Sequence, residues 1–154
     1  MKTKRIIEAT LAAAIFAAAA GSVMAQAPAD AIAKRQAIMK GLGAGVGAVN
    51  TANGAADFAT AQSKAAEVAM SAKSLGALFP AGSGPDSGTK TRAKAEIWSD
   101  QAGFTAAYGK LTAATDALVA ATAAKDADKV KAALGGVQQS CGGCHTAYRG
   151  PPVP

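Results

Sequence analysis

The chain has 154 residues, a length that suggests a single domain. Its 16 Lys and Arg and 10 Asp and Glu give a formal net charge of +6, but no basic arm with interleaved aromatic residues is present, which argues against nucleic-acid binding. Half of the residues are hydrophobic and only 5% are aromatic, so a small alanine-rich core would gain from a large buried cofactor.

Residues 1–25 have the layout of a secretory signal peptide. Lys2, Lys4 and Arg5 form a positive start, an apolar run covers 9–21, and small residues precede a cleavage site after Ala25. The apolar run is shorter than the roughly 20 residues that span a bilayer, so we expect cleavage rather than an integral membrane protein. The expected mature domain is 26–154.

The mature chain is predicted to be helical almost throughout, because alanine is abundant and no segment alternates apolar and polar residues. Four helical stretches are separated by turn residues and begin near Asp30, Asp57, Ile97 and Asp126. A long Gly/Pro/Ser loop, 80–94, separates the second from the third. This pattern predicts an all-α fold, an antiparallel four-helix bundle. The four glycines within 41–47 indicate either a broken first helix or close approach of a neighbour, and the sequence does not separate these.

The two cysteines and the one histidine of the chain stand together, as Cys141, Cys144 and His145. Cys-x-x-Cys-His is the attachment signal of a c-type haem. Cysteines three apart on a helix present both sulfurs on one face, where they can form thioethers with the haem vinyl groups. The histidine that follows is then an axial ligand of the iron.

Three other interpretations of the motif are weaker. A disulfide within Cys-x-x-Cys closes a very short loop and stabilises little. A thioredoxin-like redox site needs a βαβ setting, which the helical pattern does not offer. A zinc site normally needs four ligands, and only three candidate ligands stand together.

Only nine residues follow His145, and none is a methionine or histidine, so a second axial ligand of the usual kind must come from upstream. Met39 and Met70 are the candidates in the mature chain. Met39 is preferred because Arg35 lies four residues before it on the same helix face, where its guanidinium could pair with a haem propionate. Methionine on an apolar helix face is also common as plain packing, which is the interpretation preferred for Met70.

The stretches "KRQAIMK" (34–40), "EIWSD" (96–100) and "CGGCHTAYR" (141–149) together resemble class II cytochrome c, the cytochrome c′ family. The resemblance implies a periplasmic four-helix bundle with one covalently bound haem c near one end, often a homodimer through the first two helices. It also implies that Arg35 contacts a propionate and that Arg149 lies beside His145. Trp98 is expected to anchor the third helix.

The family divides by the residue on the distal side of the iron. A nonpolar residue there leaves five-coordinate, mostly high-spin iron that binds nitric oxide and carbon monoxide. The matching position here is Met39, which points to the low-spin subgroup, with His145 and Met39 as axial ligands.

The resulting expectation is a periplasmic electron carrier that serves redox partner proteins and is not an enzyme. The alternative is a gas-binding protein like the high-spin relatives. A peroxidase-like enzyme is disfavoured because no second histidine is present to act as distal acid or base.

Overall fold

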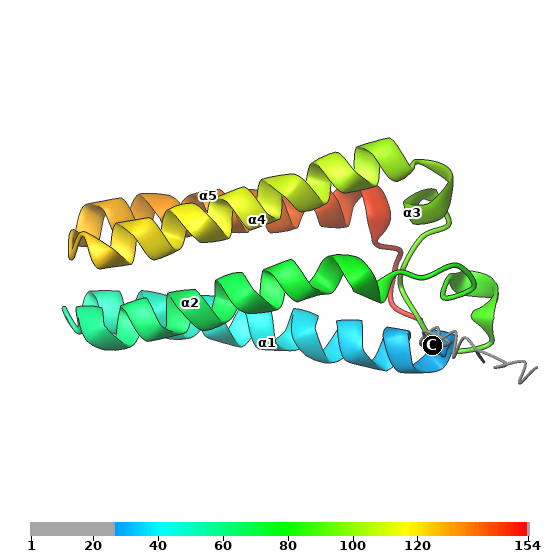
Figure 1. Cartoon of the computed structure of the whole chain (residues 1–154), viewed down its shortest axis with the longest axis horizontal. Coiled ribbons are helices and arrows are strands. Elements are labelled where there is room, and N and C mark those ends of the chain that lie inside the picture. The colour runs from blue at the N-terminus through cyan, green and yellow to red at the C-terminus, as the bar shows by residue number, and fades with distance from the viewer. Residues whose placement is uncertain (1–26, 154) are drawn as a thin grey trace, which may run out of the picture.

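The computed structural model describes residues 27–153 and is an antiparallel bundle of four long helices (Figure 1). The long helices are α1 (Pro28–Gly54), α2 (Phe58–Leu75), α4 (Gln101–Ala123) and α5 (Ala127–Tyr148), and α3 (Glu96–Ser99) is a single turn. No helix among the described residues is long and apolar enough to cross a membrane. The predicted signal peptide and its cleavage point lie outside the described residues.

Local capping explains where three of the long helices begin. The carboxylates of Asp57, Asp100 and Asp126 each accept a hydrogen bond from the backbone N–H three residues further on. The sequence predicted that helices begin near Asp57 and Asp126. The first helix differs from the prediction: it begins at Pro28, a favourable first position, and Asp30 lies inside its first turn without capping it.

The third predicted helix is interrupted. Asp100 adopts a non-helical conformation (φ −118°, ψ 64°) that ends α3, and its side chain caps the start of α4. The expectation of one helix from Ile97 to Ala121 is therefore wrong at its start. Residues 96–99 form a separate turn at the end of the long loop.

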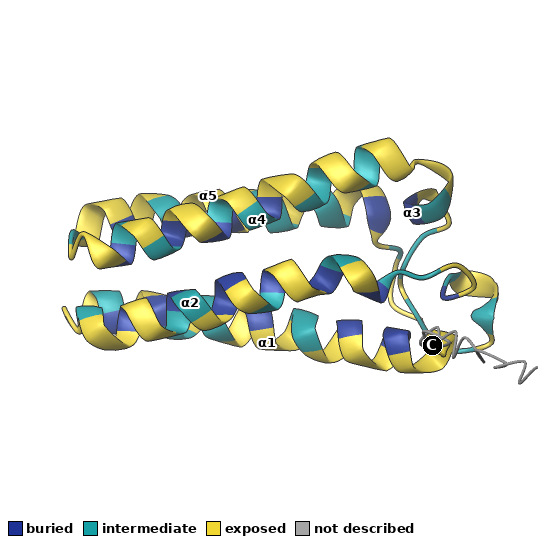
Figure 2. Ribbon diagram, in the orientation of Figure 1, coloured by how far each residue is buried: buried dark blue, intermediate teal, exposed yellow. Residues whose placement is uncertain are grey.

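The core runs along the bundle axis and consists of aliphatic side chains from all four long helices (Figure 2). Its buried members include Leu42, Val49, Val68, Leu75, Leu111, Leu118, Val130, Leu134 and Val137. Seven of these nine residues lie on α2, α4 and α5. This confirms the predicted all-α bundle.

The glycine-rich half of the first helix is continuous rather than broken, since α1 extends to Gly54. Gly45 is a position where a larger residue would clash, because a Cβ there would lie 2.6 Å from Cγ2 of Val68 on α2. At Gly41, Gly43 and Gly47 a Cβ would meet no atom within 4 Å. Close approach of α1 to α2 thus explains one of the four glycines.

The long loop from 76 to 95 returns across the end of the bundle and joins the C-terminal segment. Lys94 N–H donates to the carbonyl of Tyr148 at 3.0 Å, and Gly150 N–H donates to the carbonyl of Arg92 at 2.7 Å. Ala93 and Arg149 form an isolated antiparallel bridge. We call this pairing of 92–94 with 148–150 the clasp; it fixes the loop against the last turn of α5.

Candidate haem-binding site

The Cys-x-x-Cys-His motif lies in the last two turns of α5. The helix continues through the motif to Tyr148, and Arg149 then turns to extended backbone (φ −113°, ψ 124°). Cys141, Cys144 and His145 are half-buried rather than exposed. The helix therefore presents both sulfurs and the imidazole toward the inside of the bundle end, as the motif's spacing predicted.

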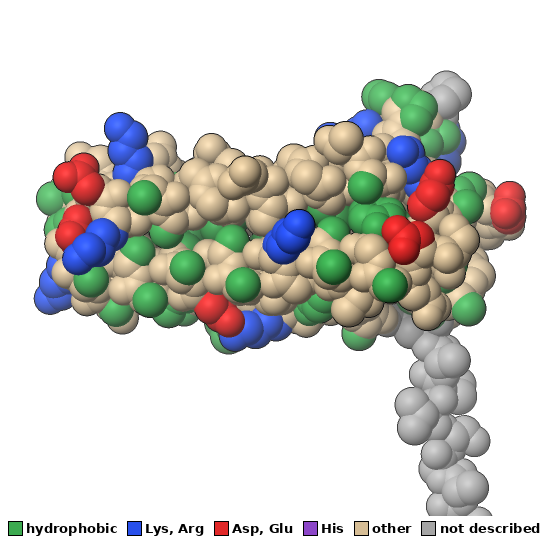
Figure 3. All heavy atoms as spheres, turned by 90° about the horizontal axis from the view of Figure 1, so that it is seen from above, with side chains coloured by type: hydrophobic (Ala, Val, Ile, Leu, Met, Phe, Trp, Pro, Cys, Tyr) green, Lys and Arg blue, Asp and Glu red, His purple; other side chains and the backbone are tan. Residues whose placement is uncertain are grey.

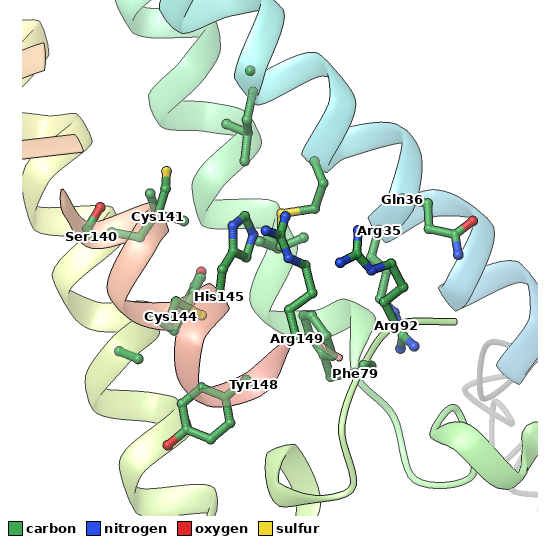
Figure 4. A pocket seen from close by; sticks show the side chains of 18 of the residues that line it. Arg35, Gln36, Phe79, Arg92, Ser140, Cys141, Cys144, His145, Tyr148 and Arg149 are labelled. Atoms are coloured by element: carbon green, nitrogen blue, oxygen red, sulfur yellow. The ribbon is translucent and has the colours of Figure 1, made fainter. Parts of the chain in front are cut away.

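A cavity of about 660 Å³ opens beside this motif (Figure 4). Its walls come from the four long helices, α3 and the loop, and they include the apolar side chains of Leu42, Val46, Val68, Leu75, Leu111 and Val137. Cys141, Cys144 and His145 border it from α5, and Met39 borders it from α1. A large, mostly apolar cavity with two thiols and an imidazole on one wall fits a covalently attached haem.

The two cysteines do not have the environment of redox-active thiols. They are not joined as a disulfide. Burial raises the pKa of both thiols, and the neighbouring Cys141 adds to the shift at Cys144. Reactive redox thiols instead have lowered pKa values. Within residues 27–153 no group of three or more His, Cys, Asp or Glu side chains is placed to hold a metal ion.

The imidazole of His145 is held near positive charge. Burial lowers its pKa, and the charges of Arg149 and Arg92 lower it further. Neutral imidazole is the form that binds a metal, so this environment favours ligation. The structure also places Arg149 beside His145, in agreement with the resemblance.

The two candidate methionines lie in different surroundings. Met39 is half-buried and lines the cavity, whereas Met70 on α2 is 65% exposed and absent from the lining. Of the two, Met39 is the one brought to the same cavity as His145. Whether its sulfur binds iron stays a prediction.

Arg35 is buried, with 4% of its surface exposed, and its terminal nitrogens are already in use. Nη1 donates to the carbonyl of Leu78 and to Oγ of Ser83, and Nη2 donates to the carbonyl of Ser83 and to Oγ1 of Thr91. Burial lowers the pKa of Arg35. The guanidinium also lies over the Phe79 ring at 4.8 Å.

These contacts give Arg35 a structural role that the sequence did not show, because it holds the long loop onto α1. Its Nε–H is the donor not used in these bonds. Contact with a propionate stays a prediction. Trp98 agrees with its expected anchoring role, since its indole N–H donates to the carbonyls of Phe79 and Pro80, both at 3.1 Å.

The cavity lining contains cations but no carboxylate. Arg35, Lys40, Arg92 and Arg149 border it, and no Asp or Glu does so among the described residues. Figure 4 shows the side chains of His145 and Arg149 pointing from the end of α5 toward α1, which carries Arg35. A cofactor with carboxylate side chains, such as haem, suits this lining electrostatically.

Sequence reasoning did not single out Tyr148 and Asp100. Tyr148 lies one turn after Cys144, lines the cavity and donates its hydroxyl to Oδ2 of Asp100 at 2.8 Å. A Cβ at Gly103 would collide with both groups. The four-residue spacing of Tyr148 from Cys144 was a usable signal, but its partner Asp100 is 48 residues away.

Comparison with known proteins gives one consistent family. The family model described as "Cytochrome C'" matches residues 30–149. A cytochrome c′ of Rhodopseudomonas palustris is 39% identical over 132 residues, which cover 84% of this chain and 88% of that protein. A cytochrome c′ of Rubrivivax gelatinosus is 40% identical over 126 residues, 80% of this chain and 97% of that one.

Solved structures agree. The crystal structure of cytochrome c′ from Rubrivivax gelatinosus matches with a TM-score of 0.74 and 35% identity over 80% of this chain and 98% of that one. A ferrous variant of cytochrome c′ from Alcaligenes xylosoxidans, solved with bound NO, matches with a TM-score of 0.74 and 28% identity. The match covers 82% of this chain and 98% of that one. Another cytochrome c′ structure is described as having an unusual ligand-controlled dimer dissociation. It matches with a TM-score of 0.74 and 28% identity over 80% of this chain and 97% of that one. Since these matches cover the whole bundle and its cysteine motif, we conclude that the chain belongs to the cytochrome c′ family and carries a covalently attached haem c.

Proposed function

We propose that this protein binds diatomic gases, nitric oxide and carbon monoxide, at the distal side of a haem iron whose proximal ligand is His145. The support is the solved relative from Alcaligenes xylosoxidans, which holds NO at 28% identity across 98% of its length. Another variant of cytochrome c′ from the same organism is described with carbon monoxide bound. The comparisons therefore favour the alternative of the sequence analysis over the His/Met electron carrier.

The residues of the chain have distinct parts in this proposal. When bound, the cofactor supplies an iron that takes a gas molecule as a ligand. Cys141 and Cys144 tether it, and His145 supplies the imidazole on one side. Met39 and the apolar side chains around it line the cavity wall from α1 and limit water there. No catalytic role is part of the proposal.

One observation keeps electron transfer as a second candidate. Met39 lines the same cavity as His145, and methionine is a known axial ligand that raises the reduction potential. If its sulfur reached the iron, both axial positions would be filled and gas would have to displace it. The fold accommodates both functions. Whether the Met39 sulfur binds the iron distinguishes the electron carrier from the gas-binding protein.

The deciding experiment compares visible spectra and carbon monoxide binding of the ferrous protein in wild type, Met39→Ala and Met70→Ala. We expect a five-coordinate, high-spin wild type that binds carbon monoxide. Met39→Ala should keep that coordination and bind the gas faster, because it removes steric bulk from the distal wall. Met70→Ala, the matched control at an exposed site, should leave both properties unchanged.

A six-coordinate, low-spin wild type that becomes high-spin only in Met39→Ala would contradict gas binding as the primary role. That result would instead support the electron carrier.

We further propose a periplasmic location, on the expected signal peptide and on the family. Redox partner proteins would keep the iron ferrous for gas binding. A homodimer through α1 and α2 is proposed by analogy with the relative that is described as a dimer.

A further inference from the structure

A second hollow, of about 430 Å³, lies outside the haem cavity at the end of α5. It shares Arg92, His145 and Arg149 with the cavity. The rest of its wall consists of Gly142 and Thr146 from the last turns of α5, Gly150 of the clasp and Pro151, which follows it. The imidazole of His145 thus borders the haem cavity and also a separate, more exposed space.

The clasp holds the two arginines of this hollow in fixed relation. Arg92 Nε–H donates to the carbonyl of Gly150 at 2.9 Å, while Gly150 N–H donates back to the carbonyl of Arg92 at 2.7 Å. The bridge between Ala93 and Arg149 holds the backbone of the second arginine next to this pairing. Both arginine side chains, from distant parts of the sequence, line the same hollow.

Most N–H donors of the Arg92 and Arg149 guanidinium groups make no hydrogen bond within the described residues. Hydrogen bonding within the described chain uses only Nε of Arg92, and it leaves the guanidinium of Arg149 without an acceptor. No Asp or Glu borders the hollow among the residues that the structure describes. Planar guanidinium groups match the geometry of carboxylate and phosphate oxygens, often through two parallel hydrogen bonds.

One feature opposes an anion here, namely the C-terminal end of α5, whose dipole carries about half a negative elementary charge. The last turn is already compensated: Lys94 Nζ donates to the carbonyl of Ala147, and Arg149 N–H donates to the carbonyl of His145. Two full positive charges on Arg92 and Arg149 outweigh the remaining half charge. At this end of the molecule the surface carries Asp and Glu side chains as well as Lys and Arg side chains (Figure 3), but no carboxylate lines the hollow among the described residues.

We propose that Arg92 and Arg149 form a binding site for a small inorganic oxyanion, such as phosphate, in the hollow beside His145. The bound anion lies against the imidazole and so makes the reduction potential of the iron depend on anion concentration. This inference rests on haem attachment through Cys141 and Cys144, and it does not depend on gas binding. The carboxylates of the haem share the same chemistry and are the other source of an anion for this pair.

The test uses the ferric holoprotein and inorganic phosphate. Paramagnetic iron speeds the ³¹P relaxation of phosphate that binds near it. We expect a saturable, several-fold enhancement in wild type that is lost in Arg92→Gln and in Arg149→Gln. Arg149→Lys, which keeps the charge but not the planar fork, should restore only part of it.

The matched control is Lys131→Gln, which removes one exposed charge from the same helix about 20 Å away along its axis. It should keep the full enhancement. At constant ionic strength, phosphate should also lower the midpoint potential of wild type and of Lys131→Gln, because a nearby anion stabilises ferric iron. Circular dichroism shows whether each variant is folded.

Two results would overturn the site. If phosphate relaxation in wild type equals that in the arginine variants and the potential does not respond, the hollow binds no free oxyanion. If there is no phosphate response but Arg92→Gln shifts the potential in anion-free buffer far more than Lys131→Gln does, the pair is occupied by the haem carboxylates. Carbon monoxide binding, measured separately, reports on the proposed function in either case.

Discussion

At the scale of single residues, Arg35 shows how a buried charge can be satisfied without a carboxylate. Its two terminal nitrogens reach two backbone carbonyls and two hydroxyl groups of the long loop. Phe79 and Trp98 add their ring faces, at 4.8 and 5.9 Å from the guanidinium carbon. One side chain on α1 thus orders the loop that forms one wall of the haem cavity.

Replacement of Arg35 by alanine should therefore destabilise the fold. The change leaves several buried acceptors without donors, and we expect the free energy of unfolding to fall by about 3 kcal/mol. Urea unfolding of the holoprotein measures it. Lys34→Ala, which removes an exposed charge from the neighbouring position, should change the stability by no more than about 0.5 kcal/mol. Equal effects in the two variants would show that the contacts of Arg35 do not hold the loop.

At the scale of the elements, α2, α4 and α5 all begin at an aspartate. In each case hydrogen bonds from the first turn lower the pKa of the carboxyl below its usual 3.8, and at Asp100 the Tyr148 hydroxyl contributes as well. A carboxyl with a lowered pKa in the folded state stabilises that state fully above the unfolded value. The stabilisation is lost as the pH falls below 3.8 toward the folded value.

Asparagine at such a position keeps an acceptor for the cap but removes the ionisation. Asp126→Asn should therefore make stability less steeply dependent on pH below about 4, with little change near pH 7. Urea midpoints measured between pH 7 and pH 2.5 give the slope. Asp30→Asn serves as the control, because Asp30 lies in the first turn of α1 without capping it. An unchanged slope in Asp126→Asn would exclude the cap as a source of acid sensitivity.

At the scale of the whole molecule, the bundle is tight along one seam and open at one end. Gly45 allows α1 to approach Val68 of α2 closely, and Val68 also lines the haem cavity. The close contact between α1 and α2 therefore lies at the wall of the cavity that encloses the flat cofactor. The clasp and Arg35 then connect the loop to both α5 and α1.

Two glycine substitutions on the same helix test this packing. Gly47→Ala has free space around its Cβ and should raise the free energy of unfolding by about 0.5–1 kcal/mol, since alanine favours the helix. Gly45→Ala forces a stiff β-branched neighbour to move, and overpacking of about 1–3 kcal/mol should outweigh that gain. Thermal unfolding of the two variants compares them directly. If both substitutions stabilised the protein, the contact between α1 and α2 at Gly45 would not be tightly packed.

Much of the site followed from local pattern. Cys141, Cys144 and His145 needed only their spacing on one helix, and the helix starts near Asp57 and Asp126 needed only a polar residue before an apolar stretch. Met39 and Arg35 were placed on one face of α1 by their four-residue separation. These relations are short-range, so the order of residues alone determines them. The same holds for the all-α class and for the haem-attachment motif.

The tertiary structure decided the remainder. The loop's route brought Thr91 to Arg35 and Arg92 beside Arg149, and Asp100 both broke the third helix and met Tyr148. These contacts join residues 48 to 58 positions apart, and such pairings depend on where the loop packs rather than on any local spacing. The sequence by itself determined the haem-attachment motif, whereas only the folded chain decided which charges surround it, because electrostatic neighbours are set by distance in space.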